Sequence, residues 1–260
     1  MNDELNVIHG CSVTGRIKQI KQPYGGYIPV KDMDVTVLGD DIDELDSVES
    51  ISPSTVGSVV DYLVRFMSGT PVEEAFHVGL MGAWMIGELV HANELLSFIN
   101  GLDDDSICSA IILSRYDACI RAGIEFYQPI SLSDISQSTI SNIRIMVERS
   151  LNFFKQYGEK VLDGFTFEGG YTDIVVSGDG DFITSDTLWD FKVSKNKPNK
   201  NHTLQLLMYW RMGLHSKHPE FKNIQYLGIV NPRLNMVYRI PVEKISSDVI
   251  ETVERDVIGY

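Results

Sequence analysis

The sequence predicts an α/β protein, of the α+β kind, in which a helical N-terminal region precedes a region of strands and helices. The first observation is that apolar residues recur at helical spacing between residues 52 and 157. The second is that short apolar runs separated by turn-forming residues follow this region. The third is size: 260 residues, 43% of them hydrophobic, suffice for one buried core with additions or for two small domains.

Four helices are expected in the N-terminal region. Each either begins with a helix-capping signal or has apolar residues at helical spacing along its length. Ser52 precedes Pro53, which places a capping residue before a proline at the first helical position. Thr70, Pro71 and Glu73 form a capping box with a proline in the same place. The expected ranges are 52–67, about 70–98, about 104–122 and about 136–157.

The region after residue 157 is expected to contain four strands and two helices. A hairpin turn is expected at 177–180, where Ser-Gly-Asp-Gly readily adopts turn conformations, and a second turn at 231–234. The expected strands are 165–176, 187–193, 224–230 and 236–242, with helices at about 203–216 and from 246 or 247 to near 259.

These elements divide the chain into three segments. Residues 1–50 are expected to be an irregular lead-in, and the six acids at 40–49 are expected to form a solvated loop. Residues 51–135 form a helical region packed on the core, which comprises residues 136–260.

The composition also predicts where the protein resides. No uncharged apolar run approaches the length of a membrane span, and the N-terminus has neither a basic start nor an apolar segment typical of a secretion signal. Cys11, Cys108 and Cys119 lie far apart, which favours a reducing compartment and argues against an iron–sulfur or zinc site. We therefore expect a cytoplasmic protein that does not bind membranes.

Charge is unevenly distributed along the chain. The net charge of −14 opposes binding to a polyanion, because such binding depends on Lys and Arg displacing counterions. Between residues 192 and 222, however, seven Lys and Arg residues accompany a single acid, Glu220. This window is consistent either with a phosphate-binding surface or with an ordinary solvated positive face.

The residues best suited to chemistry lie just before this window and at its first residue. Asp173 lies near the end of one expected strand, and Asp190 lies within the next. If these strands are adjacent, the two carboxylates and the carbonyl of Phe191 are suitable ligands for a hard divalent cation. Lys192 follows Asp190 by two residues, so its side chain points to the same face of the strand. There it could orient or deprotonate water while the metal supplies Lewis acidity. A second acid-x-Lys triplet ends at Lys222 and is interpreted as surface.

Three segments together resemble the PD-(D/E)xK nuclease superfamily, and within it the RecB-like branch. They are residues 168–173 (EGGYTD), 188–195 (LWDFKVSK) and 205–209 (QLLMY), and the resemblance covers about residues 136–245. It implies a restriction-endonuclease-like core, with a central mixed sheet flanked by helices. It further implies that Asp173 and Asp190 bind Mg²⁺ or Mn²⁺, that Lys192 is catalytic, and that Gln205 and Tyr209 support the site or contact the substrate.

The RecB-like branch also carries a histidine on an earlier helix, in a pattern like G-x-x-x-H. Residues 87–91 match this pattern, so His91 is a candidate fourth metal ligand, with His77 as the alternative. A helix histidine paired with a neighbour such as Glu94 explains the pattern equally well. The four-cysteine cluster of some relatives is absent from the sequence, as is a nucleotide-binding G-x-x-x-x-G-K-[ST] loop.

The leading hypothesis is therefore a metal-dependent DNase. Its expected partner is DNA, with RNA, a homo-oligomer and a protein partner left open. The residues expected to bind phosphates are Lys195, Lys197, Lys200 and Arg211. Two alternatives remain: a nuclease-fold protein that binds nucleic acid or a partner without cutting, and a structural α/β domain in which the aspartates only pair with lysines.

Overall fold

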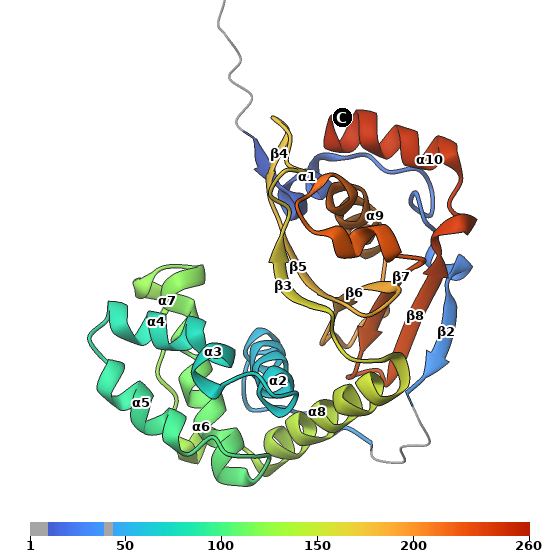
Figure 1. Cartoon of the computed structure of the whole chain (residues 1–260). Helices are drawn as coiled ribbons and strands as arrows, with labels where there is room; N and C mark the ends of the chain where they lie inside the picture. The colour runs from blue at the N-terminus through green and yellow to red at the C-terminus, as the bar shows by residue number, and fades with distance from the viewer. Residues whose placement is uncertain (1–9, 39–43) are drawn as a thin grey trace, which may run out of the picture.

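The computed structural model of this chain describes residues 10–38 and 44–260. These residues form a mixed α/β structure in which a helical lobe stands beside a core built on a six-stranded sheet (Figure 1). The expected fold class is confirmed at this level, including the mixed sheet flanked by helices. No helix among the described residues is both long enough and apolar enough to cross a membrane.

The large sheet has the strand order β2-β8-β7-β6-β5-β3. Strands β6 and β7 are parallel, and every other neighbouring pair is antiparallel. The strands are β2 (Asp34–Val37), β3 (Leu162–Thr166), β5 (Asp179–Ile183), β6 (Thr187–Phe191), β7 (Tyr226–Asn231) and β8 (Met236–Pro241). Two further short strands, β1 (Cys11–Ser12) and β4 (Val175–Ser177), pair with each other in parallel.

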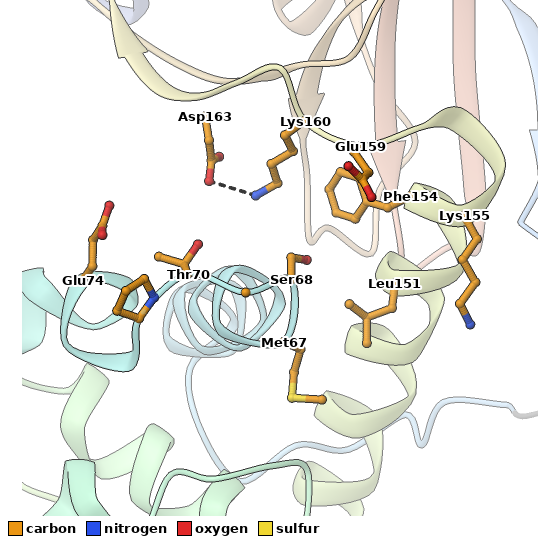
Figure 2. Close-up of a pocket in the computed structure, with 12 residues that line it drawn as sticks. Met67, Ser68, Thr70, Glu74, Leu151, Phe154, Lys155, Glu159, Lys160 and Asp163 are labelled. Carbon is orange, nitrogen blue, oxygen red and sulfur yellow. Dashed lines mark hydrogen bonds and ion pairs between the residues drawn. The ribbon is translucent and has the colours of Figure 1, made fainter.

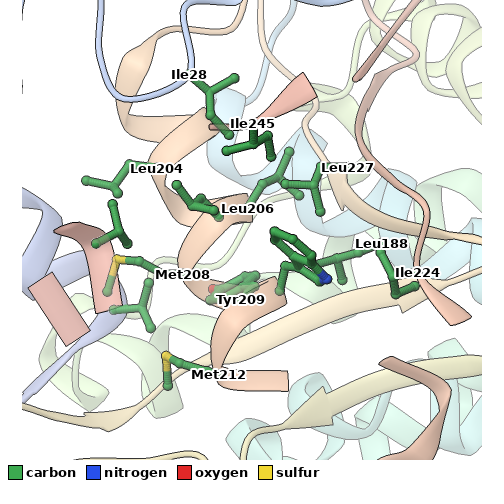
Figure 3. Packing of buried hydrophobic residues seen from close by; sticks show 14 of the residues in the cluster. Ile28, Leu188, Leu204, Leu206, Met208, Tyr209, Met212, Ile224, Leu227 and Ile245 are labelled. Carbon is green, nitrogen blue, oxygen red and sulfur yellow. The ribbon is translucent and has the colours of Figure 1, made fainter. Parts of the chain in front are cut away.

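The two faces of this sheet pack against different helices because strand side chains alternate between faces. Leu188 of β6 packs into a cluster with residues of α9 (Lys200–His215), including Leu204 and Met208 (Figure 3). Its neighbour Trp189 points to the opposite face, where it meets Phe153 of α8 (Gln137–Tyr157) edge-on with ring centroids 4.7 Å apart. Side chains at the even positions of β6 therefore lie on the α9 face.

The first helix of the helical lobe lies where the sequence predicts it, but the other helices of the lobe are shorter than expected. The lobe comprises α2 (Pro53–Met67), α3 (Val72–Ala75), α4 (His77–Met85), α5 (Leu89–Ser97), α6 (Asp104–Ser114) and α7 (Asp117–Arg121). The prediction of one helix over 70–98 is wrong, partly because Gly87 adopts φ +79°, which ends α4 before α5 begins. Gly82 packs so closely on the start of α7 that a Cβ there would lie 2.0 Å from the backbone oxygen of Tyr116.

The expected hairpin turn at 177–180 is also wrong. Residue 178 separates β4 from β5, and the true turn lies at 184–186, between β5 and β6. Gly180 is a strand residue: a Cβ there would come within 2.2 Å of the Phe165 ring on β3. Glycine is needed here because the two strands pack closely. From the sequence alone, such a glycine cannot be distinguished from one that forms a turn.

Much of the expected lead-in belongs to the core. Strand β2 forms an edge of the large sheet, and α1 (Val13–Gln19) packs against α9. The acidic stretch lies partly outside the described residues, but Glu49 is not solvated as expected. Its side chain is only 3% exposed and accepts a hydrogen bond from Arg233, also buried, at 2.7 Å. The C-terminus forms α10 (Ser247–Thr252), which continues into a π-helical segment, η6 (Val253–Ile258).

Candidate active site

Two aspartates face each other across the antiparallel pair β5–β6. Phe182 pairs with Trp189 and Ile183 with Leu188, so the same register places Asp181 opposite Asp190. Asp190 is 1% exposed, and its Oδ2 atom has no hydrogen-bond partner among the described residues. The Asp181 carboxylate is held in place by the backbone NH of Phe191, which donates to Oδ2 at 2.6 Å.

Lys192 completes this pair, as the sequence predicts. Its Nζ donates to Oδ1 of Asp190 at 2.7 Å. Although burial works to lower it, the pKa of Lys192 is raised, because the negative charges of Asp190 and Asp181 stabilise the ammonium form. The side chain remains 27% exposed, so a solvent molecule or a substrate group can reach the nitrogen from outside.

The crowding of two carboxyls in this place has an electrostatic consequence. Burial, reinforced by the negative charge of Asp190, raises the pKa of Asp181 to about 7. Lys192 and the NH of Phe191 oppose this rise. Two neighbouring carboxylates with one lysine carry an excess negative charge near neutral pH, which a cation between them would neutralise.

Helix α9 contributes three polar side chains on the facing side of the site. His202, Gln205 and Tyr209 are spaced three and four residues apart and therefore share one helix face. Burial lowers the pKa of His202 and raises that of Tyr209, and the charge of Asp190 acts on both side chains. Gln205 donates to the Tyr209 hydroxyl at 2.8 Å. The structure thus brings Gln205 and Tyr209 to the aspartates, as the resemblance implies.

Asp173 does not lie where the sequence predicts. It precedes β4 of the small sheet, outside the strands that neighbour β6, and its side chain is exposed. The expected adjacency of the Asp173 and Asp190 strands is therefore wrong, and Asp181 is the acid that the fold places opposite Asp190. Sequence reasoning missed Asp181 because residues 177–180 were interpreted as the turn. The available signal was the spacing D-x₈-D-x-K around the turn-forming residues 184–186.

His91 is also not brought to the aspartates. It lies on α5, which packs against α4 and α6 at the end of the helical lobe remote from the sheet (Figure 1). Its imidazole is half exposed, and Nδ1 lies 3.7 Å from Oε2 of Glu94. His77, the alternative, lies at the start of α4 in the same lobe and is exposed.

The predicted phosphate-binding residues fall into two groups. Lys195, Lys197 and Lys200 are exposed in and after the loop that leads from β6 into α9. Arg211 instead lies on the side of α9 that faces the C-terminal segment, where its guanidinium forms an ion pair with Glu254 at 2.6 Å. The structure therefore separates Arg211 from the three lysines.

The helical lobe borders the site through α2. Arg65 of α2 lies against Gly164 of β3, where a Cβ would come within 3.0 Å of its Nη2 atom, and its charge acts on Asp181. Farther along the same border runs a groove of about 820 Å³, between the end of α2, the end of α8 and β3. Figure 2 shows Phe154 and Leu151 on one side of this groove and the Lys160–Asp163 ion pair, 3.0 Å long, above it.

The donor set fits a magnesium-like ion better than a zinc-like one. Within residues 10–38 and 44–260, no three His, Cys, Asp or Glu side chains are grouped as a closed metal site. Mg²⁺ commonly uses only one or two carboxylates and takes its remaining ligands from water and substrate phosphate. Asp181 and Asp190 provide such a pair, and the unpartnered Oδ2 of Asp190 is a buried acceptor that a cation would satisfy.

No protein-family model, curated protein or solved structure matches this chain.

Proposed function

We propose that this chain is a metal-dependent nuclease that hydrolyses DNA phosphodiester bonds on a restriction-endonuclease-like core. The observation that carries the proposal is the pair of the buried Asp190 and the half-buried Asp181, with Lys192 bound to Asp190, on neighbouring strands and facing a helix that supplies further polar groups. A merely structural ion pair would not need a second buried carboxyl, whose negative charge is costly without a cation.

Each residue has a definite task in this proposal. Asp181 and Asp190 would hold Mg²⁺ or Mn²⁺ through their carboxylate oxygens, and the carbonyl of Phe191 remains a candidate third ligand. When bound, the metal supplies Lewis acidity and neutralises charge on the scissile phosphate. Lys192 orients the attacking water and stabilises the developing negative charge, because its Nζ reaches the exposed edge of the site while still bound to Asp190.

The residues of α9 act on the substrate side. Tyr209 stays protonated at neutral pH because burial raises its pKa, so its hydroxyl remains a donor as well as an acceptor. Gln205 fixes the direction of that hydroxyl. His202 stays neutral because burial lowers its pKa, which leaves one ring nitrogen able to donate to a phosphate oxygen.

Charge segregation supports a nucleic-acid substrate despite the overall acidity. Residues 10–31 and 191–219 contain no Asp or Glu but carry ten of the 22 Lys and Arg residues. The fold brings these two segments together, since α1 packs on α9 and the Gln22 side chain donates to Asn201 at 2.8 Å. By contrast, residues 51–135 contain eleven acids, three arginines and no lysine. Arg211 and Lys217 pair with Glu254 and Glu168 from outside these segments, so phosphates would be attracted mainly to the exposed lysines around the start of α9.

The proposal is tested by digestion of closed circular duplex, linear duplex and single-stranded DNA with Mg²⁺ or Mn²⁺, against an EDTA control. Asp190→Asn and Asp181→Asn should each abolish cutting, whereas Asp173→Asn, an exposed acid outside the pair, should retain it. Metal-dependent cutting that is lost in Asp173→Asn but kept in Asp181→Asn would show that the site has been assigned to the wrong acid. A folded protein that binds DNA without cutting any substrate would support the non-cutting alternative.

A further inference from the structure

A loop far from the aspartates in sequence, residues 22–29, is anchored on the first turn of α9. Gln22 is 9% exposed and bonds to Asn201, and the Thr203 hydroxyl donates to the carbonyl of Ile28 at 2.7 Å. Gly26 approaches so closely that a Cβ there would lie 2.6 Å from Cβ of Lys200. The loop is therefore attached to the helix turn that carries His202, one of the side chains of the proposed active site.

Tyr24 forms the tip of this loop and is fully exposed, at 106% of its reference area. Its position is fixed by a tight turn in which the NH of Gly26 donates to the carbonyl of Pro23 at 3.0 Å. Gly25 within the turn has φ +83°, a conformation that type II turns place at their third residue and that favours glycine. A short rigid turn thus holds an aromatic ring in solvent, without packing it against the core.

One exposed aromatic residue alone carries no functional meaning. The surroundings of Tyr24 provide this meaning, since the loop lies within the first of the two acid-free segments described above and is anchored on the second. Lys21, Lys31, Lys197 and Lys200 are all exposed on either side of the loop or at the helix turn beneath it. Grooves that bind single-stranded nucleic acid combine these two features, positive charge that follows the backbone and aromatic rings on which bases stack.

We propose that Tyr24 is a stacking platform for an unpaired base of a strand that runs from the exposed lysines beside this loop toward the Asp181–Asp190 pair. This inference rests on the proposed function and extends it to the substrate class. The faces of internal bases in a duplex are covered by their neighbours, so a protruding ring can stack only on an unpaired or terminal base. The preferred substrate would therefore be single-stranded DNA, or duplex DNA with a single-stranded end, and not a closed duplex.

The test measures binding and cutting separately on the full chain. Binding is followed by fluorescence anisotropy of a labelled single strand of about 16 nucleotides, in EDTA and low salt because phosphate contacts weaken steeply with salt. Unlabelled closed circular duplex serves as the competitor. The variants are Tyr24→Ala and Tyr24→Phe, with Trp84→Ala as the matched control, because Trp84 is an exposed aromatic residue (60%) on the acidic helical lobe.

Tyr24→Ala should weaken binding of the single strand by roughly 5- to 150-fold, the usual range for loss of one base–aromatic stack. Tyr24→Phe and Trp84→Ala should bind as the unaltered chain does, and the dissociation constant for the circular duplex, calculated from the competition, should be the same for all four proteins. With Mg²⁺, Tyr24→Ala should raise KM for single-stranded substrate while leaving kcat nearly unchanged, because Tyr24 does not contact the reacting phosphate.

The other outcomes distinguish failure of the stacking role of Tyr24 from failure of the proposed nuclease activity. Equal single-strand affinity of Tyr24→Ala and the unaltered chain would overturn the platform, and the nuclease would stand if metal-dependent cutting persists. An equal loss in Tyr24→Phe and Tyr24→Ala would overturn stacking in favour of the hydroxyl. Tyr24-dependent binding without any cutting would overturn the nuclease and support the platform. No binding of either nucleic acid would overturn both.

Discussion

Replacing Asp181 with Asn should stabilise the metal-free protein at pH 8 while abolishing nuclease activity. The reason is that the Asp181 carboxyl is buried beside Asp190, and these two effects raise its pKa to about 7. An Asn side chain has nearly the same shape and keeps an oxygen to accept from the NH of Phe191. It carries no charge at any pH.

The sign of the effect follows from proton linkage. The folded protein binds a proton at Asp181 more tightly than the unfolded chain does, so this contribution to stability is present at low pH and is lost as pH rises through about 7. With an unfolded pKa of 3.8, the loss between pH 5 and pH 8 is at most about 3 kcal/mol. The Asn variant lacks this loss, so its advantage over the unaltered chain should grow by up to that amount across the same range.

The assay is urea unfolding in EDTA at pH 5 and pH 8, with Asp173→Asn as the control because that carboxyl is exposed and lies outside the pair. The reasoning would be refuted if the difference in unfolding free energy between Asp181→Asn and the unaltered chain were the same at both pH values. It would also be refuted if Asp173→Asn produced the pH-dependent gain instead. Added Mg²⁺ should remove the advantage of Asp181→Asn at pH 8, because only the unaltered pair gains stability from the cation.

Three further predictions concern other parts of the molecule. Lys192→Met should lower the cleavage rate by roughly 10²-fold or more in a Mg²⁺ digestion assay, since a donor to the developing charge is lost. Arg233→Met should lower the unfolding free energy by about 3–5 kcal/mol in urea, because the buried carboxylate of Glu49 loses its ion pair, and the Asn142 amide that still donates to it is neutral. Gly82→Ala should lower the melting temperature, at a cost of about 1–3 kcal/mol, because its Cβ would lie 2.0 Å from a backbone oxygen at the start of α7.

Matched variants separate these mechanisms from general effects of substitution. Lys222→Met removes the lysine of the second acid-x-Lys triplet, which lies outside the site, and should leave cleavage unchanged. Gly57→Ala in α2 adds a methyl whose nearest neighbour is 3.9 Å away, so it should be neutral or stabilise by up to about 1 kcal/mol. Cleavage lost in Lys222→Met, or a destabilised Gly57→Ala, would contradict the respective explanation, as would an Arg233→Met protein as stable as the unaltered chain.

The sequence by itself determined the elements whose signals are local. Helix α8 and strand β6 lie where they are expected, because an apolar stripe at helical spacing and a short apolar run each depend only on nearby residues. The pair Asp190 and Lys192 followed from the two-residue period of a strand, which holds in any sheet. Gln205 and Tyr209 were expected at the site from the resemblance of the chain to a family.

Only the tertiary structure decided which acid joins Asp190. Asp173 and Asp181 lie near glycines in similar surroundings in the sequence, and both precede Asp190 by a plausible distance. The choice depends on where β5 turns into β6, and that turn is set by strand register and by the packing of Gly180 under the Phe165 ring. Such contacts between distant residues leave no local pattern.

The tertiary structure likewise decided which charged residues lie on the surface around the site. The linear sequence shows a basic window from 192 to 222, but Arg211 turns away to Glu254, and residues 10–31 take a place beside α9 that no spacing predicts. Local patterns fix the periodicity of a segment and the face on which a residue lies. Which faces meet is determined by the packing of the whole chain, and for this protein that packing placed Asp181 beside Asp190 and the Tyr24 loop on α9.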